Sequence, residues 1–498
     1  MSTSYKAFMD KESISGGQLL KKANQLKRAG KLDEAIALYH QVIEINPNLA
    51  WAYSNLGDAL VQQNYLDDAI DCFNQTIRIN STTAFFHGQL SEALAHQGKF
   101  NQALVCFDRF LKLSLNNQLK FDKNGLSIEK IYENKITQSS LWKAVKSANI
   151  LAHNNQTEMA INLYQKIIED SPYQYSEIYN TLGKLLFRAG ERKKAVTNFE
   201  IAIFLNPDID RYHLNLAEAT DSWLLSVKFY RSAVKLNPMV LKNYYEQVEY
   251  INTQDIKIKN PIFVVGCGHS GTSVMLALLG SHPCLYPIPY ESSIFLQSLS
   301  KIEEKILVWD TECLAEQKKR WVEKTPTHIF QIGKFMKIRS QSQFILMLRD
   351  GRDVVCSLKH RPEYQQFLDR IERWVYDNLA GFSYWKHPQI HVVKYEDLVI
   401  NPELTLKRVF EFLREEYNPK VLEFYQIERR WYSSEIVKPD KIESKQEHWQ
   451  NRNWQINQPL FDGRGRWKKE MTEGEKIIFK KKAQKYLLEF GYVQDDSW

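Results

Sequence analysis

The chain has 498 residues, and its 66 lysines and arginines against 59 aspartates and glutamates give a formal net charge of +7. This length allows about three domains of average size. The small charge is spread along the chain, so it gives no sign of nucleic-acid binding. No apolar run approaches the ~20 residues that span a bilayer, and the first residues lack the apolar core of a signal peptide.

The six cysteines are scattered along the chain without the spacing of metal ligands. Such a distribution favours a reducing compartment. We therefore expect a cytoplasmic protein without a bound metal, and we expect residues 1–14 to be a disordered N-terminus.

From residue 15 onward the sequence repeats with a period of about 34 residues, which is typical of stacked two-helix units. One aromatic residue per copy is interpreted as core, at Tyr39, Phe73, Phe107, Tyr164 and Phe199. The pattern resembles the tetratricopeptide repeat and implies an all-α solenoid of about six repeats over residues 15–240, with a break near 116–139. Residues 241–258 are expected to form a linker helix. A solenoid presents a concave surface, so a protein or peptide partner is expected.

A strand, a turn of small residues and a helix are predicted in succession over residues 261–280. The run Ile262 to Val265 is typical of a buried strand, and Gly266 to Ser273 forms the turn. Backbone N–H groups in such a turn converge on an anion at the start of the following helix. Thr272 stands where a nucleoside-triphosphate loop requires lysine. A turn that only packs tightly remains the alternative.

Two further segments carry charged residues near predicted strand ends. Lys324 ends a strand before Thr325, and Arg349 follows the apolar run 344–348. If a helix follows Arg349, Ser357 and Arg361 share one face of it. Because ligands of parallel sheets bind at the carboxyl ends of strands, these groups predict an anion site there. An isolated salt bridge is the alternative for each arginine.

Taken in order, these segments resemble sulfotransferases that use 3′-phosphoadenosine 5′-phosphosulfate (PAPS). The resemblance extends to VEKTP at 322–326, to VVKYEDLVINPELTLKRVFEFL at 392–413 and to GRWKKEMTEGE at 465–475. RDGR at 349–352 and SSEIVKP at 433–439 are similar to the tyrosylprotein branch. The resemblance implies a three-layer, P-loop-like α/β domain over residues 259–498, with a mainly parallel sheet. The whole chain is thus expected to be multidomain.

The resemblance also implies roles for individual residues. Glu291 would be the base, with Glu323 as the fallback, Lys324 would stabilise the transferring sulfuryl group, and His269 would assist the leaving group. The implied PAPS-binding residues are Gly268, His269, Ser270, Gly271, Thr272, Ser273, Arg349, Ser357, Arg361, Tyr395, Ser433, Ser434, Lys438, Arg464 and Arg466. The alternative for Glu291 is an exposed charge, and for Arg464 and Arg466 a solvated surface.

This sequence departs from the family pattern at two positions. His269 stands where many members carry lysine or arginine, and Glu291 lies about one residue further from His282 and Pro283 than the family pattern. A bound phosphosulfate is expected to raise the pKa of His269 and favour its charged form.

The expected function is transfer of a sulfuryl group from PAPS to a hydroxyl of a protein, peptide or glycan recruited by the repeats, with tyrosine as one candidate. Two alternatives stay open: a P-loop-type kinase, disfavoured by Thr272, and a scaffold that only binds nucleotide. Because the two halves are expected to have independent cores, a fragment from about Asp255 onward should bind the nucleotide product.

Overall fold

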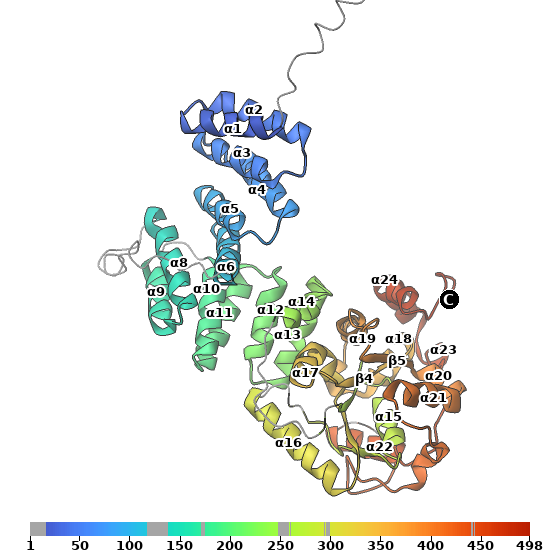
Figure 1. The fold of residues 1–498 in the computed structure, drawn as a ribbon. Coiled ribbons are helices and arrows are strands. Elements are labelled where there is room, and N and C mark those ends of the chain that lie inside the picture. Colours follow the sequence, from blue (N-terminus) through green and yellow to red (C-terminus); the bar gives the residue numbers. More distant parts are fainter. Residues whose placement is uncertain are drawn as a thin grey trace, which may run out of the picture. The chain divides into compact units, whose positions relative to one another are not determined.

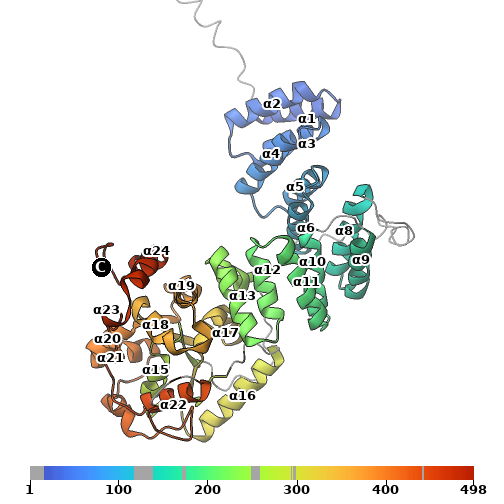
Figure 2. The same cartoon turned by 180° about the vertical axis from the view of Figure 1, so that it is seen from behind.

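The computed structural model describes residues 16–116, 138–170, 175–247, 258, 260–292, 294, 299–439, 442 and 444–498. These residues form two compact units, Met1–Pro207 and Asp208–Trp498 (Figures 1 and 2). The predicted disorder of residues 1–14 lies outside the described residues. So do most of the predicted break at 116–139 and residues 248–257 of the predicted linker.

The first unit is built from paired helices, as the repeat pattern predicts. They are α1 (Gly16–Arg28), α2 (Leu32–Ile45), α3 (Ala50–Gln62), α4 (Leu66–Ile79), α5 (Ala84–His96), α6 (Phe100–Asn116), α8 (Gln138–His153), α9 (Thr157–Asp170), α10 (Ser176–Arg188) and α11 (Arg192–Leu205). A Cβ atom on Gly57 would lie 2.6 Å from the ring of Phe73, and one on Gly183 would lie 2.7 Å from Phe199. The small residues therefore let paired helices approach closely. All five recurring aromatic residues are buried, which confirms their assignment to the core.

The second unit contains a five-stranded sheet in the order β2-β3-β1-β4-β5. Its strands are β1 (Ile262–Gly266), β2 (Leu285–Pro287), β3 (Arg320–Lys324), β4 (Gln343–Leu348) and β5 (Ile390–Lys394). Every neighbouring pair is parallel, which confirms the predicted parallel sheet. Strands β3 and β2 lie on one side of β1, and strands β4 and β5 lie on the other. The strand order therefore reverses at β1. Such a reversal opens a crevice at the carboxyl ends of the central strands.

Helices cover both faces of this sheet (Figure 1). They include α15 (Thr272–Leu279), α16 (Leu299–Ala315), α17 (Ile332–Ile338), α18 (Gly351–Ser357), α19 (Phe367–Phe382), α20 (Tyr395–Ile400), α21 (Pro402–Leu413), α22 (Lys445–Gln455), α23 (Trp467–Glu470) and α24 (Glu473–Glu489), with 3-10 turns η3 (Pro326–Gln331), η4 (Leu358–His360), η5 (Pro362–Tyr364) and η6 (Pro419–Gln426). Phe263 and Val265 of β1 face one apolar core, whereas Ile262 and Val264 face the other. This alternation gives the expected three layers.

The last repeat helices belong to the second unit. They are α12 (Asp210–Ala219), α13 (Trp223–Leu236) and α14 (Val240–Gln247). Tyr230 of α13 stacks on Phe330 with ring centroids 5.5 Å apart, and both belong to the same apolar core as Phe263. The expectation of independent cores is therefore wrong. The compact units divide after Pro207 rather than at residue 240, because α12 to α14 bury their apolar faces against the α/β layers.

Charged contacts reinforce this packing. Glu218 of α12 accepts hydrogen bonds from the hydroxyls of Tyr230 and Tyr245, both at 2.6 Å, and from Lys334 Nζ at 3.1 Å. Arg231 Nε of α13 donates to Asp377 Oδ1 of α19 at 2.7 Å. The sixth repeat is thus bound to the helices beside the sheet by buried polar contacts as well as by apolar packing.

Candidate active site

The loop between β1 and α15 is shaped by glycines that approach other backbone and side chains. Gly266 has a φ of 146°, and a Cβ there would overlap the carbonyl of Met347. Gly271 has a φ of 88°, and a Cβ there would lie 2.8 Å from the ring of Tyr395. The loop passes directly into α15, whose first N–H groups are free of helical acceptors. These donors and the positive end of the helix favour an anion.

The polar side chains at this loop fit a phosphate or sulfate group. Ser270 is buried, and its Oγ has no hydrogen-bond partner among the described residues. The Nε atom of Arg349 is buried without a hydrogen-bond acceptor in that same part of the chain. The Nε atoms of Arg361 and Arg373 also lack a hydrogen bond there, and the carboxylate oxygens of their ion pairs lie at 3.5 and 3.6 Å. Buried donors left unpaired are costly, so an anion that accepts from them would be stabilising.

Arg349 and Ser357 both meet the loop, as the sequence predicts. Arg349 Nη1 donates to the carbonyl of His269 at 3.1 Å and Nη2 donates to that of Gly463 at 2.7 Å. Its guanidinium lies 4.3 Å from the ring centroid of Tyr395. Ser357 Oγ lies 2.9 Å from His269 Nδ1. The end of β4 and helix α18 therefore bring both residues to the loop.

Arg361 and Arg373 lie close enough to His269 to lower the pKa of its ring. Arg361 follows α18 and η4 in extended geometry, so the expectation that it shares a helix face with Ser357 is wrong. Burial lowers the pKa of Arg361 despite the opposing effect of Glu363, and the nearby Arg373 lowers it further. Arg373 extends from α19, and a Cβ on Gly268 would overlap its guanidinium. Asp377 Oδ2 lies 3.6 Å from Arg373 Nε. Repulsion between the arginines favours occupation of the space between them by an anion.

Glu291 and Lys324, to which the resemblance assigns the roles of base and stabilising cation, form an ion pair beside the loop. Lys324 Nζ donates to Glu291 Oε1 at 2.6 Å, and Arg452 Nη2 of α22 donates to the same oxygen, also at 2.6 Å. The Glu291 side chain is 35% exposed. Partial desolvation opposes its ionisation, but Arg452 and Lys324 hold its pKa well below the usual range. Among the described residues, none donates a hydrogen bond to Oε2. That oxygen remains able to accept a proton from another group.

Glu323 precedes Lys324 in β3, but its carboxylate is hydrogen-bonded to three other side chains. It is completely buried and accepts hydrogen bonds from Ser292, Thr325 and His328 at 2.9, 2.6 and 3.0 Å. Successive side chains of a strand point to opposite faces, so Glu323 is directed away from the Lys324 side. The structure therefore argues against Glu323 as the fallback base.

His269 adopts left-handed backbone geometry with a φ of 72°, and its ring packs on that of His448, with centroids 5.7 Å apart. Burial, Arg373 and His448 hold the pKa of His269 well below its usual value. Burial and Arg361 likewise lower the pKa of His448, to about 3. Both rings are thus neutral at pH 7 before any anion binds, the opposite of the charged state expected for His269 with a bound phosphosulfate.

Among the weaker candidates, the Tyr395 ring lies against Gly271 of the loop, whereas Ser433, Ser434 and Lys438 have contacts elsewhere. Tyr395 donates its hydroxyl to the carbonyl of Phe461 at 2.8 Å. Ser433 accepts from the N–H of Glu435, the Ser434 carbonyl accepts from Arg430, and Lys438 Nζ lies 5.1 Å from the Trp454 ring. These last three contacts do not involve the glycine loop.

Arg464 and Arg466 are paired with carboxylates of their own turn. Arg464 is bound to Asp462 at 2.7 Å and Arg466 to Glu470 at 2.8 Å. The N–H groups of Gly465 and Trp467 donate to Asp353 at 2.8 and 3.1 Å, which fixes this turn to α18. Neither guanidinium contacts the loop in this structure.

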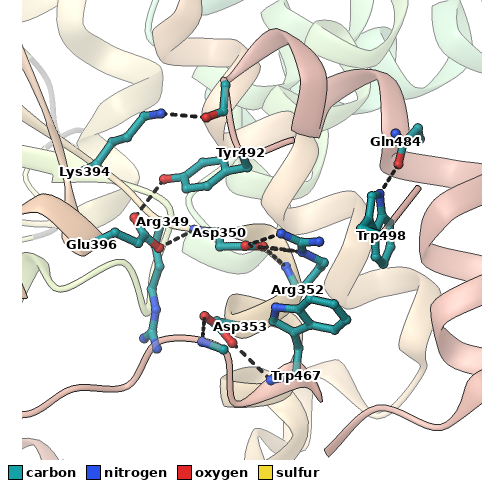
Figure 3. A network of polar contacts seen from close by, with 12 residues as sticks. Arg349, Asp350, Arg352, Asp353, Lys394, Glu396, Trp467, Gln484, Tyr492 and Trp498 are labelled. Atoms are coloured by element: carbon teal, nitrogen blue, oxygen red, sulfur yellow. Dashed lines mark hydrogen bonds and ion pairs between the residues drawn. The ribbon is translucent and has the colours of Figure 1, made fainter. Parts of the chain in front are cut away.

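A cavity of about 630 Å³ opens beside this turn. Its walls include Asp350, Glu396 and Trp498, and Figure 3 shows the polar contacts around it. Arg352 is held by Asp350 at 2.7 Å and lies against both Trp467 and Trp498, 4.3 and 4.6 Å from their ring centroids. These contacts anchor the segment after β4 on the side away from Arg349.

Three residues at the site were missed by the sequence reasoning: Arg373, His448 and Arg452. Arg373 lies in a mixed run of charged residues that looks like an exposed helix surface. His448 and Arg452 are four residues apart, so they share one face of α22. That spacing within the tryptophan-rich segment HWQNRNW was the available signal.

Comparisons with known proteins give different matches for the two halves of the chain. A sulfotransferase family model matches residues 304–419, and tetratricopeptide repeat models match residues 23–64 and 52–83. An uncharacterized protein of Aquifex aeolicus (strain VF5) is 27% identical over 222 residues, which is 37% of this chain. The match spans only 29% of the length of that relative.

Solved structures similar to the chain fall into the same two groups. The sulfotransferase domain from the curacin biosynthetic pathway is 15% identical with a TM-score of 0.30, covering 45% of this chain and 97% of its own. The sulfotransferase domain of the Synechococcus PCC 7002 olefin synthase is 14% identical with a TM-score of 0.30, covering 47% and 98%. The TPR protein YrrB is 18% identical with a TM-score of 0.23, covering 42% and 95%.

Two structural features are absent from the described part of the chain. No helix there is long and apolar enough to cross a membrane. No group of three or more His, Cys, Asp or Glu side chains there is arranged to hold a metal ion.

Proposed function

Because the chain joins tetratricopeptide repeats to a sulfotransferase-family domain, we propose that it transfers a sulfuryl group from PAPS to a hydroxyl of a protein or peptide. The observation that carries this proposal is the ion pair between Glu291 and Lys324 beside the glycine loop. A base and a cation at the entrance of an anion-binding loop are the groups that sulfuryl transfer to a hydroxyl requires.

The chemistry assigns one role to each group. Glu291 Oε2 would accept the proton of the acceptor hydroxyl as its oxygen forms a bond to sulfur. The bond from sulfur to the bridging oxygen of the nucleotide breaks, and adenosine 3′,5′-bisphosphate leaves with the electron pair. Lys324 and the N–H groups at the start of α15 would stabilise the charge that develops on the bridging and sulfuryl oxygens.

Glu291 is a weak base while both cations contact it. Binding of the sulfuryl group would give Lys324 and Arg452 new acceptors. Their separation from Glu291 Oε1 would raise the pKa of the carboxylate towards that of an effective base. The ion pair would therefore keep the base inactive until the donor binds.

Arg349 and Ser357 would recognise the 3′-phosphate of the nucleotide. Arginine forms paired, charge-assisted hydrogen bonds with phosphate, and Ser357 adds a donor on the other side of His269. Arg361 and Arg373 would contribute further positive charge. ATP lacks a 3′-phosphate, so this set of residues would favour PAPS over ATP.

The repeats are proposed to recruit the acceptor. Trp51 of α3 and Phe85 of α5 are each 50% exposed, and their ring centroids lie 5.9 Å apart. Such neighbouring exposed aromatic residues are typical of surfaces that bind peptides. A tyrosine or glycan acceptor and a cytoplasmic location stay predictions.

A two-step experiment tests the function against its alternatives. In a thermal-shift assay, adenosine 3′,5′-bisphosphate should raise the melting temperature, whereas ATP with magnesium should not. A preference for ATP with magnesium would support the kinase instead. Labelled PAPS should then transfer label to proteins of a cell lysate, identified by mass spectrometry. Binding without transfer to any acceptor would support the scaffold.

A further inference from the structure

Helix α22 brings a cation to the loop that the loop itself does not supply. Arg452 Nη2 donates to Ser273 Oγ at 3.0 Å and to Glu291 Oε1 at 2.6 Å. It therefore bridges the glycine loop and the carboxylate expected to act as base. Its side chain is only 14% exposed, and its guanidinium lies 4.2 Å from the ring centroid of Tyr432. Burial against an aromatic face keeps the guanidinium in this position.

The same helix carries a second residue to the loop. His448 lies one turn before Arg452 and packs on His269. Helix α22 begins with a capping box in which Ser444 and Glu447 satisfy each other's backbone N–H groups, so its first turn is well defined. Two contacts from one helix face thus dock α22 on the loop.

The charges at the loop explain why an external arginine is needed. His269 follows Gly268 at the centre of the loop but is neutral, as described above. Arg349, proposed to bind the 3′-phosphate, contacts the loop through the His269 carbonyl. Arg361 and Arg373 lie near His448, but neither of them forms an ion pair with Glu291. The cations that form ion pairs with Glu291 among the described residues are Lys324 and Arg452, both bound to Oε1. A sulfuryl group placed beside Lys324 and Arg452 would replace this oxygen as their acceptor.

We propose that Arg452 is a catalytic residue whose guanidinium binds the sulfuryl oxygens during transfer, supplying from α22 the positive charge that His269 does not provide. This inference rests on the proposed function. Arg452 would stabilise the charge on the sulfuryl oxygens as the new sulfur–oxygen bond forms and the old one breaks, while the proton passes to Glu291. Its loss would then affect turnover and PAPS affinity more than affinity for adenosine 3′,5′-bisphosphate.

The test compares Arg452→Ala with a double variant that also carries His269→Arg, which places a positive charge in the loop itself. Turnover of PAPS with tyrosine-containing peptides should fall by about 10²–10³ in Arg452→Ala, the usual effect of losing one preorganised donor. Calorimetry should show PAPS affinity falling at least about fivefold more than bisphosphate affinity, because the bisphosphate lacks the sulfuryl group. Adding His269→Arg to Arg452→Ala should restore turnover at least about tenfold.

Two control variants distinguish a catalytic role of Arg452 from a role in folding. Arg408→Ala removes an exposed arginine of α21 and should leave turnover unchanged. Arg452→Lys keeps the charge and should retain more activity than Arg452→Ala. Equal loss of PAPS and bisphosphate affinity in Arg452→Ala, with no rescue by His269→Arg, would show that the arginine only holds α22 and would overturn the inference.

The proposed function can fail separately. If the wild-type protein binds neither nucleotide, both the function and this inference are overturned. If it binds and turns over PAPS while Arg452→Ala retains normal turnover and a normal affinity ratio, only the inference is overturned.

Discussion

Removal of the sixth repeat should unfold the α/β domain. The test uses two fragments, one beginning at Asp208 and one beginning at Ile258, so that only the second lacks α12 to α14. In the second fragment Lys334, which is 7% exposed, loses Glu218, and Asp377 loses Arg231. Removing one partner of a buried pair costs about 3–5 kcal/mol.

Apolar losses add to this cost. Tyr230 and Tyr245 are each 1% exposed, and loss of a buried aromatic side chain costs about 3–5 kcal/mol. The contributions are not additive, but any two of them approach the total stability of about 5–15 kcal/mol of a typical domain. The fragment from Ile258 is therefore expected to lack a cooperative unfolding transition.

Circular dichroism during heating measures the outcome directly. The fragment from Asp208 should melt cooperatively and gain stability from adenosine 3′,5′-bisphosphate, by about 2.7 kcal/mol at a hundredfold excess over Kd. Within that fragment, Glu218→Ala should be strongly destabilising. Glu372→Ala should cost less than about 1 kcal/mol, because the Glu372 pair with Lys235 is exposed. Equal melting temperatures for the two fragments would refute the shared core.

Three further predictions concern the site. Arg349→Ala should weaken PAPS binding by roughly 1.5–3 kcal/mol and leave binding of adenosine 5′-phosphosulfate nearly unchanged, and equal losses in calorimetry would count against 3′-phosphate recognition. Glu291→Gln should lower turnover by roughly 10² to 10⁴ with bisphosphate affinity kept, and a near-normal rate would remove Glu291 from the mechanism. Stability should fall as pH drops from about 7.5 to 5.5, because below a pKa of ~6.5 the unfolded chain protonates histidines that the folded protein keeps neutral. His448→Gln should reduce this fall by up to about 1.4 kcal/mol per pH unit, and an unchanged pH dependence of the melting temperature would contradict the buried neutral ring.

Patterns within short segments of sequence predicted much of the fold. The apolar run before Gly266 and the run before Arg349 each formed a buried strand, because a short continuous apolar segment suits a sheet covered on both faces. Lys324 and Arg349 could be placed at one edge because carboxyl ends of parallel strands coincide. These predictions needed only the local sequence pattern and the rule that the carboxyl ends of parallel strands lie at the same edge of a sheet.

Residues that reach the loop from distant helices could not be placed in this way. Arg452 lies 179 residues from its partner Ser273, and nothing in its neighbourhood indicates which loop it meets. Arg231 is part of a repeat, where the pattern predicts a helix but not the buried Asp377 opposite it. Such contacts depend on tertiary packing, which periodicity in one helix does not encode.

The shared core of the sixth repeat also sets where this chain can be recombined. Transplanting the α/β domain onto another repeat array requires α12 to α14 to travel with it, because their buried side chains complete its interior. A chimera joined at Pro207 would cut between compact units, whereas one joined between Leu236 and Ile258 would graft foreign side chains into a packed interior. The sixth repeat therefore has to stay with the α/β domain, and only the repeats before it can be exchanged as a separate unit.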